Sequence, residues 1–224
     1  QLRTALDTPE DLLASLPAGF RPTRCAVANV AGAAMRDTLQ ARLAPLGAPV
    51  EWLHASSRRC GLACGYNQPE RLGADRWAAA IGAWQQVGSD CLVISAGTAT
   101  TIDVVRAPGL FAGGCILPGL GLMLDTLAAR TAALPRAADS LPEEALLTPP
   151  TDTLTAIAAG CLHAQLGAIE RIARQLPPGS PILLAGGHAG NLLPHLRGDV
   201  RLQPWLVMDG LLAVARDTTA GENS

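Results

Sequence analysis

The chain has 224 residues, of which 49% are hydrophobic and 16% are charged, and its formal net charge is −2. Such a composition supports a packed core and excludes a disordered or solvating role. The small net charge argues against a general binder of nucleic acid or of anionic membranes. We therefore expect one large domain or two small ones, with no nucleic-acid or membrane partner.

All 17 basic residues are arginine, and lysine does not occur in the sequence. This excludes a Schiff-base lysine and a Walker-type phosphate-binding lysine. Any phosphate chemistry must therefore use backbone N–H groups, hydroxyls, arginine and a metal ion.

Cysteine usage indicates a reducing compartment. Cys25, Cys91 and Cys115 lie in apolar, strand-like runs and are expected to be small core residues of a reduced, cytoplasmic protein. No signal peptide is visible at the start of the sequence. The longest uncharged run, Gly109 to Leu124, is too short to span a bilayer, which needs about 20 apolar residues.

The first part of the chain alternates strand-like and helical patterns. The apolar spacing predicts strands at Arg24–Val30 and Val50–His54, and helices at Ala33–Leu46 and Leu72–Gln86. One face of the last helix is predicted to be apolar, through Leu72, Trp77, Ala80, Ile81 and Trp84.

The second part begins with three strand candidates, of which the first two are joined by a glycine turn typical of a hairpin. Helices and single strands then alternate, which favours an α/β fold with a mixed sheet. A soft boundary between the two parts falls near residues 87–90. The predicted elements are strands Cys91–Ser95, Thr100–Val105, Leu110–Leu117, Pro181–Ala185 and Arg201–Trp205, and helices Leu120–Ala133, Thr153–Leu176 and Asp209–Arg216.

The first candidate site is the loop and helix start from Gly65 to Trp77. Asp75 and Arg76 are adjacent in the first helical turn. The carboxylate could accept a proton from a substrate hydroxyl, and the guanidinium could hold a substrate carboxylate through two contacts. The alternative is that Asp75 caps a helix and Arg76 is a solvated surface residue.

Three glycine-containing segments form the other candidates. In Ser95–Asp103, Gly97 would let backbone N–H groups approach an anion, and the hydroxyls of neighbouring threonines could donate to phosphate oxygens. Gly113–Gly119 would allow a close backbone or ligand approach. Leu184–His188 places two glycines at the carboxyl end of a strand, where α/β folds admit a nucleotide. For each segment an ordinary turn remains the alternative, and His188 is expected to be a surface histidine.

Together, in this order, these segments resemble the type III pantothenate kinases over nearly the whole chain. The matching motifs are G-Y-x-x-P (Gly65 to Pro69), G-x-D-R-W (Gly73 to Trp77), G-T-A-T-T-x-D (Gly97 to Asp103), G-G-x-I-x-P-G (Gly113 to Gly119) and T-x-x-A-I-x-x-G (Thr153 to Gly160).

The resemblance implies an α/β fold of the acetate/sugar kinase and actin-like superfamily, with two ribonuclease H-like halves whose mixed sheets are flanked by helices. It implies a first half at 1–88 with the pantothenate and catalytic loop, and a second half at 89–224 with phosphate, adenosine and dimer elements. The family's D-x-G-N-T/S phosphate loop does not occur before Arg24. The first half is therefore expected to lack its N-terminal hairpin, through truncation or disorder.

The implied activity is ATP-dependent phosphorylation of pantothenate, the first step of coenzyme A synthesis, by a cytoplasmic homodimer. By resemblance Asp75 is the general base, and Thr153 reaches pantothenate across the dimer interface. The implied pantothenate contacts are Tyr66, Gly73, Ala74, Asp75, Arg76 and Thr153, and the implied ATP contacts are Gly97, Thr98, Gly186 and Gly187.

The resemblance also implies Mg²⁺ and, in many members, K⁺ or NH₄⁺ held by an aspartate where this chain has Ser95. A serine supplies less electrostatic attraction for a cation, so the monovalent-cation site is in doubt here. Two alternatives remain open. One is a non-catalytic accessory protein of a transcriptional regulator on the same fold, and the other is a kinase of a different small hydroxy acid.

Overall fold

The computed structural model describes residues 17, 19–132 and 134–217. The chain forms two compact units. The first unit contains the described residues up to Gln86 and those from Trp205 onward, and the second unit contains Val87–Pro204. The predicted division into halves at residues 88 and 89 stays a prediction. The region in which the resemblance expects a missing hairpin lies largely in residues 1–16, outside the described residues.

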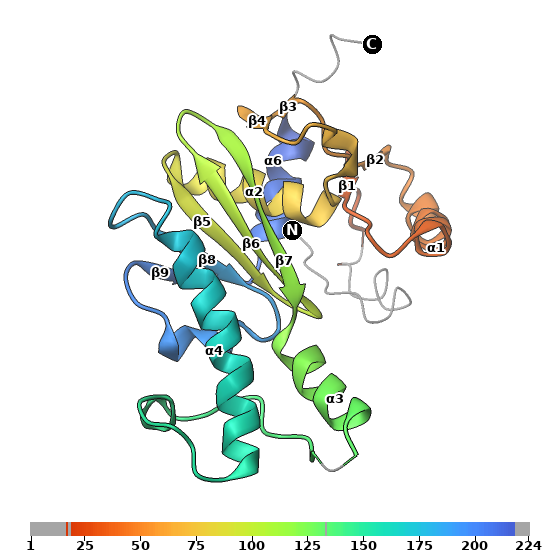
Figure 1. Cartoon of the computed structure of the whole chain (residues 1–224). Helices are drawn as coiled ribbons and strands as arrows, with labels where there is room; N and C mark the ends of the chain where they lie inside the picture. The colour runs from red at the N-terminus through yellow and green to blue at the C-terminus, as the bar shows by residue number, and fades with distance from the viewer. Residues whose placement is uncertain (1–16, 18, 133, 218–224) are drawn as a thin grey trace. The chain divides into compact units, whose positions relative to one another are not determined.

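The second unit is built on a mixed sheet (Figure 1). Within the unit the strand order is β7-β6-β5-β8-β9. β5, β6 and β7 pair antiparallel in sequence order, whereas β8 pairs parallel with β5 and β9 parallel with β8. This is the strand order of a ribonuclease H-like unit, and the predicted α/β class with a mixed sheet is confirmed. The strands are β5 (Cys91–Ala96), β6 (Ala99–Arg106), β7 (Leu110–Pro118), β8 (Ile182–Ala185) and β9 (Val200–Leu202).

One face of this sheet forms the main core, against the long helix α4 (Thr153–Ala173) and α3 (Leu120–Arg130). Because side chains alternate along a strand, Leu92 and Ile94 point into this core while Val93 and Ser95 point to the opposite face. Each fully buried Leu or Ile contributes about 1.5–3 kcal/mol relative to an exposed one. The remaining helices are α5 (Ala189–Leu192) and the short 3₁₀ turns η4 (Glu143–Leu146) and η5 (Leu193–His195).

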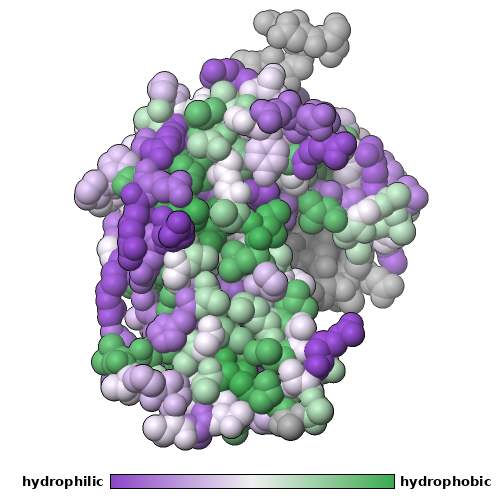
Figure 2. Space-filling view, in the orientation of Figure 1, coloured by the Kyte–Doolittle hydropathy of each residue, from purple (hydrophilic) through white to green (hydrophobic). Residues whose placement is uncertain are grey.

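Part of the second unit's surface is apolar. Leu122 on α3 and Leu154 on α4 are 44% and 49% exposed. Figure 2 shows green and pale surface over the region that α3 and α4 occupy in Figure 1. Both helices therefore carry more apolar surface than the sheet covers.

The first unit begins with a strand, a helix and a parallel strand. β1 (Cys25–Val27) and β2 (Val50–Trp52) pair in parallel, and α1 (Ala33–Leu43) connects them, followed by the 3₁₀ turn η2 (Ala44–Leu46). The predicted strand and helix positions are confirmed, although both strands are shorter than the apolar runs suggested.

Two helices of the first unit, α2 (Ala74–Val87) and α6 (Leu206–Arg216), approach each other closely through glycine. A Cβ atom on Gly210 would lie 1.8 Å from the carbonyl oxygen of Ala78, so only glycine allows this approach. Trp77, Ala80 and Ile81 of the predicted apolar face are completely buried. Trp84 is only half-buried, and Leu72 precedes the helix, which begins at Ala74 and not at Leu72 as predicted. α6 begins at Leu206 and is therefore longer than predicted.

A small hairpin in the first unit was not predicted. β3 (Arg58–Arg59) pairs antiparallel with β4 (Leu62–Cys64), and the 3₁₀ turn η3 (Pro69–Arg71) follows. Cys60 and Gly61 between the strands have φ of 49° and 79°. Two consecutive residues with positive φ are typical of a tight hairpin turn. The first of them is usually Asn, Asp or Gly, and a cysteine there concealed the hairpin.

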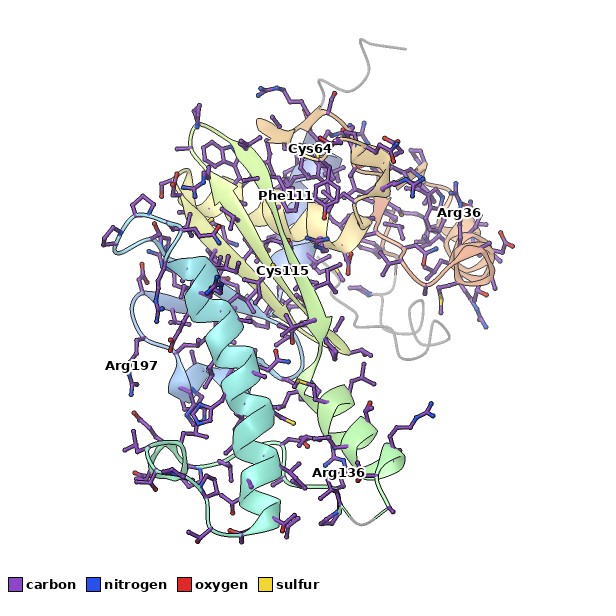
Figure 3. The ribbon with its side chains drawn as sticks, in the orientation of Figure 1. Arg36, Cys64, Phe111, Cys115, Arg136 and Arg197 are labelled. Atoms are coloured by element: carbon purple, nitrogen blue, oxygen red, sulfur yellow. The ribbon has the colours of Figure 1, made fainter. Side chains whose placement is uncertain are left out.

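The environment of Cys115 differs from the prediction. Cys91 is buried and Cys25 is half-buried, but Cys115 in the middle of β7 is exposed (Figure 3). Phe111 is the one buried residue of β7, and the other side chains of this strand are exposed or half-buried. The apolar run therefore predicted the strand correctly but not its burial. No helix in the described part of the chain is long and apolar enough to cross a membrane.

Candidate functional site

The start of α2 in the first unit positions Asp75. Asp75 Oδ1 accepts a hydrogen bond from the backbone N–H of Arg76 at 2.8 Å, and Trp77 N donates to the carbonyl oxygen of Gly73 at 3.0 Å. A Cβ on Gly73 would lie 2.8 Å from Asp75 Oδ1. Glycine at this position thus leaves space for the carboxylate, which is held at the first helical turn and is half-buried.

Arg76 points inward and contacts Tyr66. Arg76 is only 7% exposed, and its Nη1 donates a hydrogen bond to the Tyr66 hydroxyl oxygen at 2.9 Å. The guanidinium carbon also lies 5.8 Å from the centre of the Tyr66 ring. The alternative of a solvated surface arginine is therefore wrong. A buried guanidinium needs hydrogen-bond partners to offset the loss of water, and the Tyr66 hydroxyl is one of them.

A shallow depression of about 540 Å³ opens beside Tyr66 in the first unit. The residues that line it are Gly65, Tyr66, Asn67, Gln68 and Arg71. The lining combines an aromatic ring, two amides and a guanidinium, which suits a small polar molecule with a carboxylate.

The glycine turn of the second unit has its own internal bond. The N–H of Gly97 donates to the carbonyl oxygen of Ala99 at 3.1 Å. This amide is therefore already engaged, whereas Thr98 at the tip is exposed. An anion bound at the turn would contact Thr98 rather than the N–H of Gly97. We therefore expect Gly97 to shape the turn and not to bind the anion through its own N–H.

The other predicted glycine segments converge on this turn. Gly119 N donates to Thr98 O at 2.9 Å, and a Cβ on Gly119 would lie only 2.1 Å from Gly97 O. From the other side His188 N donates to Ala96 O at 2.9 Å. Gly186 has φ of +98°, and a Cβ there would lie 2.4 Å from the same carbonyl oxygen.

These contacts place the glycine segments together at the carboxyl ends of the parallel strands β5 and β8. This is the edge where α/β sheets bind ligands. Gly187 has open space around its Cα, since a Cβ there would meet no atom within 4 Å.

Ser95 lies just before the turn, on the face of the sheet opposite the main core. It is directly opposite Thr101 in the β5–β6 ladder, and Asp103 is one row further along the same face. Asp103 is 1% exposed, and a Cβ on Gly114 would lie 2.3 Å from its Oδ1. Ser95 therefore has a hydroxyl directly across the ladder. Among the described residues, no three His, Cys, Asp or Glu side chains gather as a metal site would require.

Thr153 is the first residue of α4, in the second unit, and is exposed. The preceding Asp152 caps the helix by accepting a hydrogen bond from the N–H of Thr155 at 2.9 Å. That bond lowers the pKa of Asp152 below its ordinary value. The first unit thus contains all of the predicted pantothenate contacts except Thr153.

Two side chains near the turn were not predicted to matter. His188 is half-buried, contrary to the surface position expected, and its Nε2 would lie 3.0 Å from a Cβ on Gly121 in the first turn of α3. Gln165 on α4 is completely buried, and its Nε2 donates to Pro118 O at 2.7 Å. The sequence did contain a signal for Gln165, because an amide within the apolar stripe of a helix needs a buried partner.

The strand order of the second unit, with a glycine turn at the carboxyl ends of β5 and β8, places the chain in the α/β class of ribonuclease H-like folds. The family model described as type III pantothenate kinase matches residues 3–175. A type III pantothenate kinase of Aromatoleum aromaticum is 45% identical over 217 residues, which are 94% of this chain and 84% of the relative. One from a Janthinobacterium species is 46% identical over 88% of this chain and 79% of its own length.

Among solved structures, a Campylobacter jejuni protein assigned to the Baf family of transcriptional activators aligns with a TM-score of 0.50. It is 22% identical, and the alignment covers 65% of this chain and 64% of that one. At this identity the likeness concerns the fold alone. The family match and the curated relatives are decisive: the chain belongs to the type III pantothenate kinase family.

Proposed function

We propose that this protein transfers the γ-phosphoryl group of ATP to the primary hydroxyl of pantothenate, the first step of coenzyme A synthesis. The observation that carries the proposal is the joint arrangement of Asp75, Arg76 and Tyr66 at the start of α2. The arrangement agrees with the family that the chain belongs to. A carboxylate, and a guanidinium bonded to the tyrosine that lines the depression, are groups that can receive a small hydroxy acid.

In the proposed reaction Asp75 aligns the pantothenate hydroxyl and accepts its proton. The hydroxyl oxygen forms a bond to the γ-phosphorus while the bond from that phosphorus to the bridging oxygen breaks, and ADP leaves with the electron pair. Phosphoryl transfer depends on alignment and charge stabilisation more than on covalent help from the protein. Tyr66, Gly73, Ala74 and Arg76 would orient the acceptor.

The ATP side of the proposal uses the glycine turn and the segment after β8. Thr98 is exposed at the tip of the turn, where its hydroxyl can donate to a phosphate oxygen. The backbone of the turn accepts hydrogen bonds from His188 N at Ala96 O and from Gly119 N at Thr98 O. The open space at Gly187 suits the approach of the adenosine portion.

We propose that Mg²⁺ binds together with ATP. In kinases the phosphate oxygens of the nucleotide are among the ligands of this ion. When bound, it would offset charge on the transferring phosphoryl group. A monovalent cation near Ser95 would meet hydroxyl oxygens from Ser95 and Thr101, which attract K⁺ or NH₄⁺ less strongly than a carboxylate does. We therefore propose a weak dependence on monovalent cations.

A homodimer is part of the proposal. Gly160 and Gly167 on α4 face open space, because a Cβ at either position would meet no atom within 4 Å, and Leu154 on the same helix is 49% exposed. Exposed apolar surface of this kind is usually covered by a partner. By the family resemblance, Thr153 of one protomer would contribute to the acceptor site of its partner in such a dimer. All six cysteines are free thiols, which supports a reducing compartment such as the cytoplasm.

The test is transfer of labelled γ-phosphoryl from ATP to pantothenate and to a panel of small hydroxy acids. The proposal predicts label on pantothenate, at a kcat/KM above that of every other acceptor. Transfer to a different acceptor instead would identify a kinase of another hydroxy acid. No transfer to any acceptor, with the protein folded, would favour a non-catalytic accessory role.

A further inference from the structure

One peptide group connects α4 to the glycine turn. The carbonyl oxygen of Pro118 accepts a hydrogen bond from Gln165 Nε2 at 2.7 Å. The N–H of the same peptide group, contributed by Gly119, donates to Thr98 O at 2.9 Å. In a trans peptide the C=O and N–H point in opposite directions. Gln165 and Thr98 are therefore bonded to opposite edges of a single rigid plane.

The orientation of the Gln165 amide is fixed by its neighbours. The Pro118 oxygen at 2.7 Å requires a donor, so the NH₂ group must face it. The same nitrogen lies 3.2 Å from Met123 Sδ, a weak acceptor on α3. Both N–H bonds of the amide are thus directed at the segment where β7 ends and α3 begins.

The buried amide of Gln165 lowers the stability of the folded protein. Gln165 is completely buried, and its Oε1 has no hydrogen-bond partner in the described part of the chain. An unsatisfied buried polar atom destabilises the folded state, and an apolar side chain of similar size would avoid this. Packing alone therefore does not account for glutamine at this position.

The bonded peptide acts on the turn in two ways. Gly119 restrains Thr98 through its N–H, and its missing side chain leaves room for the turn, because a Cβ would lie 2.1 Å from Gly97 O and 2.6 Å from Thr98 O. A hydrogen bond to the Pro118 carbonyl polarises the peptide and strengthens the bond donated at its other end. Rotation of this peptide would release Thr98.

We propose that Gln165 is a positioning residue for ATP, which fixes the Thr98 turn through the Pro118–Gly119 peptide. The inference rests on the proposed function, since it assigns the turn to ATP. Gln165 does not contact the reacting groups itself. It determines how rigidly the turn is presented, and it links the helix that begins with Thr153 to the nucleotide end of the site.

The experiment compares Gln165→Met with Leu162→Met in the full-length protein. Methionine matches the length of glutamine but cannot donate, and Leu162 is completely buried on the same helix without a polar contact. Three quantities are measured: thermal stability, affinity for a non-hydrolysable ATP analogue with Mg²⁺, and hydrogen exchange of the Gly119 amide. The last needs neither ATP nor pantothenate.

For Gln165→Met we expect faster exchange at Gly119 and weaker binding of the analogue, each by about 3–10-fold, the scale of one hydrogen bond. Thermal stability should change little, because the variant loses the bond to Pro118 O but also the unsatisfied Oε1. Leu162→Met should leave exchange and binding at wild-type values. Unchanged exchange at Gly119 in Gln165→Met, or a loss of binding that only follows a loss of stability, would overturn the inference. Failure of wild-type protein to phosphorylate pantothenate would instead count against the proposed function and leave the exchange result to stand by itself.

Discussion

Arg76 Nη1 lies 2.9 Å from the hydroxyl oxygen of Tyr66, and this bond joins the loop before η3 to the first turn of α2. The pair holds a buried guanidinium in one orientation against Tyr66, and Tyr66 lines the depression. The adjacent Asp75 carboxylate is fixed to the same turn. The acceptor end of the proposed site is therefore a preorganised unit of three side chains.

Replacing Tyr66 with phenylalanine removes the hydroxyl but keeps the ring. The guanidinium of Arg76 then loses a bond that orients it, so we expect KM for pantothenate to rise by up to about 10-fold, with kcat little changed. Steady-state kinetics with each substrate varied in turn would measure this. The KM for ATP is the internal control, and an equal rise for ATP would show that Tyr66 acts on the fold rather than on the acceptor.

Replacing glycine with alanine should destabilise the protein at the α2–α6 contact but have little effect at a glycine that faces open space. Gly210→Ala places a methyl group 1.8 Å from Ala78 O, and we expect it to lower the free energy of unfolding by about 1–3 kcal/mol or more. Gly190→Ala on α5 meets no atom within 4 Å and should change stability by less than about 0.5 kcal/mol. Chemical denaturation of both variants provides the measurement. Equal effects would mean that the α2–α6 contact is looser than described.

The cysteines should differ in reactivity. Burial, followed by the charge of Asp90, raises the pKa of Cys91 to about 12, whereas Cys115 is exposed. At pH 8 only about one Cys91 in ten thousand would be a thiolate, the form that reacts. Alkylation followed by peptide mapping should therefore label Cys115 first and Cys91 only after denaturation. Rapid labelling of Cys91 in the folded protein would contradict its burial.

The same pKa shift has a consequence for stability at alkaline pH. Unfolded Cys91 would ionise at its ordinary value of about 9.0, but folded Cys91 only near 12. Its contribution to stability is fully present below pH 9 and is lost as pH rises towards 12. Denaturation midpoints should therefore fall over this interval, and the fall should be smaller in Cys91→Ala.

The proposed dimer depends on the open face of α4. Gly160→Glu introduces a charge where no atom lies within 4 Å, so the isolated protomer should fold normally while the dimer dissociates. Gly190→Glu, which also enters open space on a helix, is the matched control and should remain dimeric. Sedimentation at micromolar concentration distinguishes the two. A wild-type monomer under these conditions would exclude the dimer.

Much of the fold follows from local patterns in the sequence. The apolar periodicity of Trp77 and Ile81 predicted their complete burial, and the glycine turn after β5 predicted the hairpin with β6. The hairpin at Cys60 was missed because its turn uses an uncommon residue at positive φ. Burial of Cys115 was mispredicted because an apolar strand does not reveal which of its neighbours covers it.

The candidate site could be predicted in outline from motifs, but its contacts could not. Nothing in the order of residues indicates that Arg76 turns inward to Tyr66 or that the Gly97 amide is already bonded to Ala99. The role of Gln165 depends on Pro118, 47 residues away along the chain. Such long-range pairings arise from tertiary packing and are not encoded in any local pattern.

The most direct test of the account is Asp75→Asn in the full-length protein, with phosphoryl transfer and ligand binding measured side by side. Asparagine keeps the shape of the side chain and can still accept the hydrogen bond from Arg76 N, so the fold and the binding of pantothenate and ATP should persist. General-base catalysis contributes about 10²–10⁴-fold, and we expect kcat for transfer to pantothenate to fall by at least 10²-fold. A folded Asp75→Asn protein that phosphorylates pantothenate at a near wild-type kcat would contradict the assignment of Asp75 as the base.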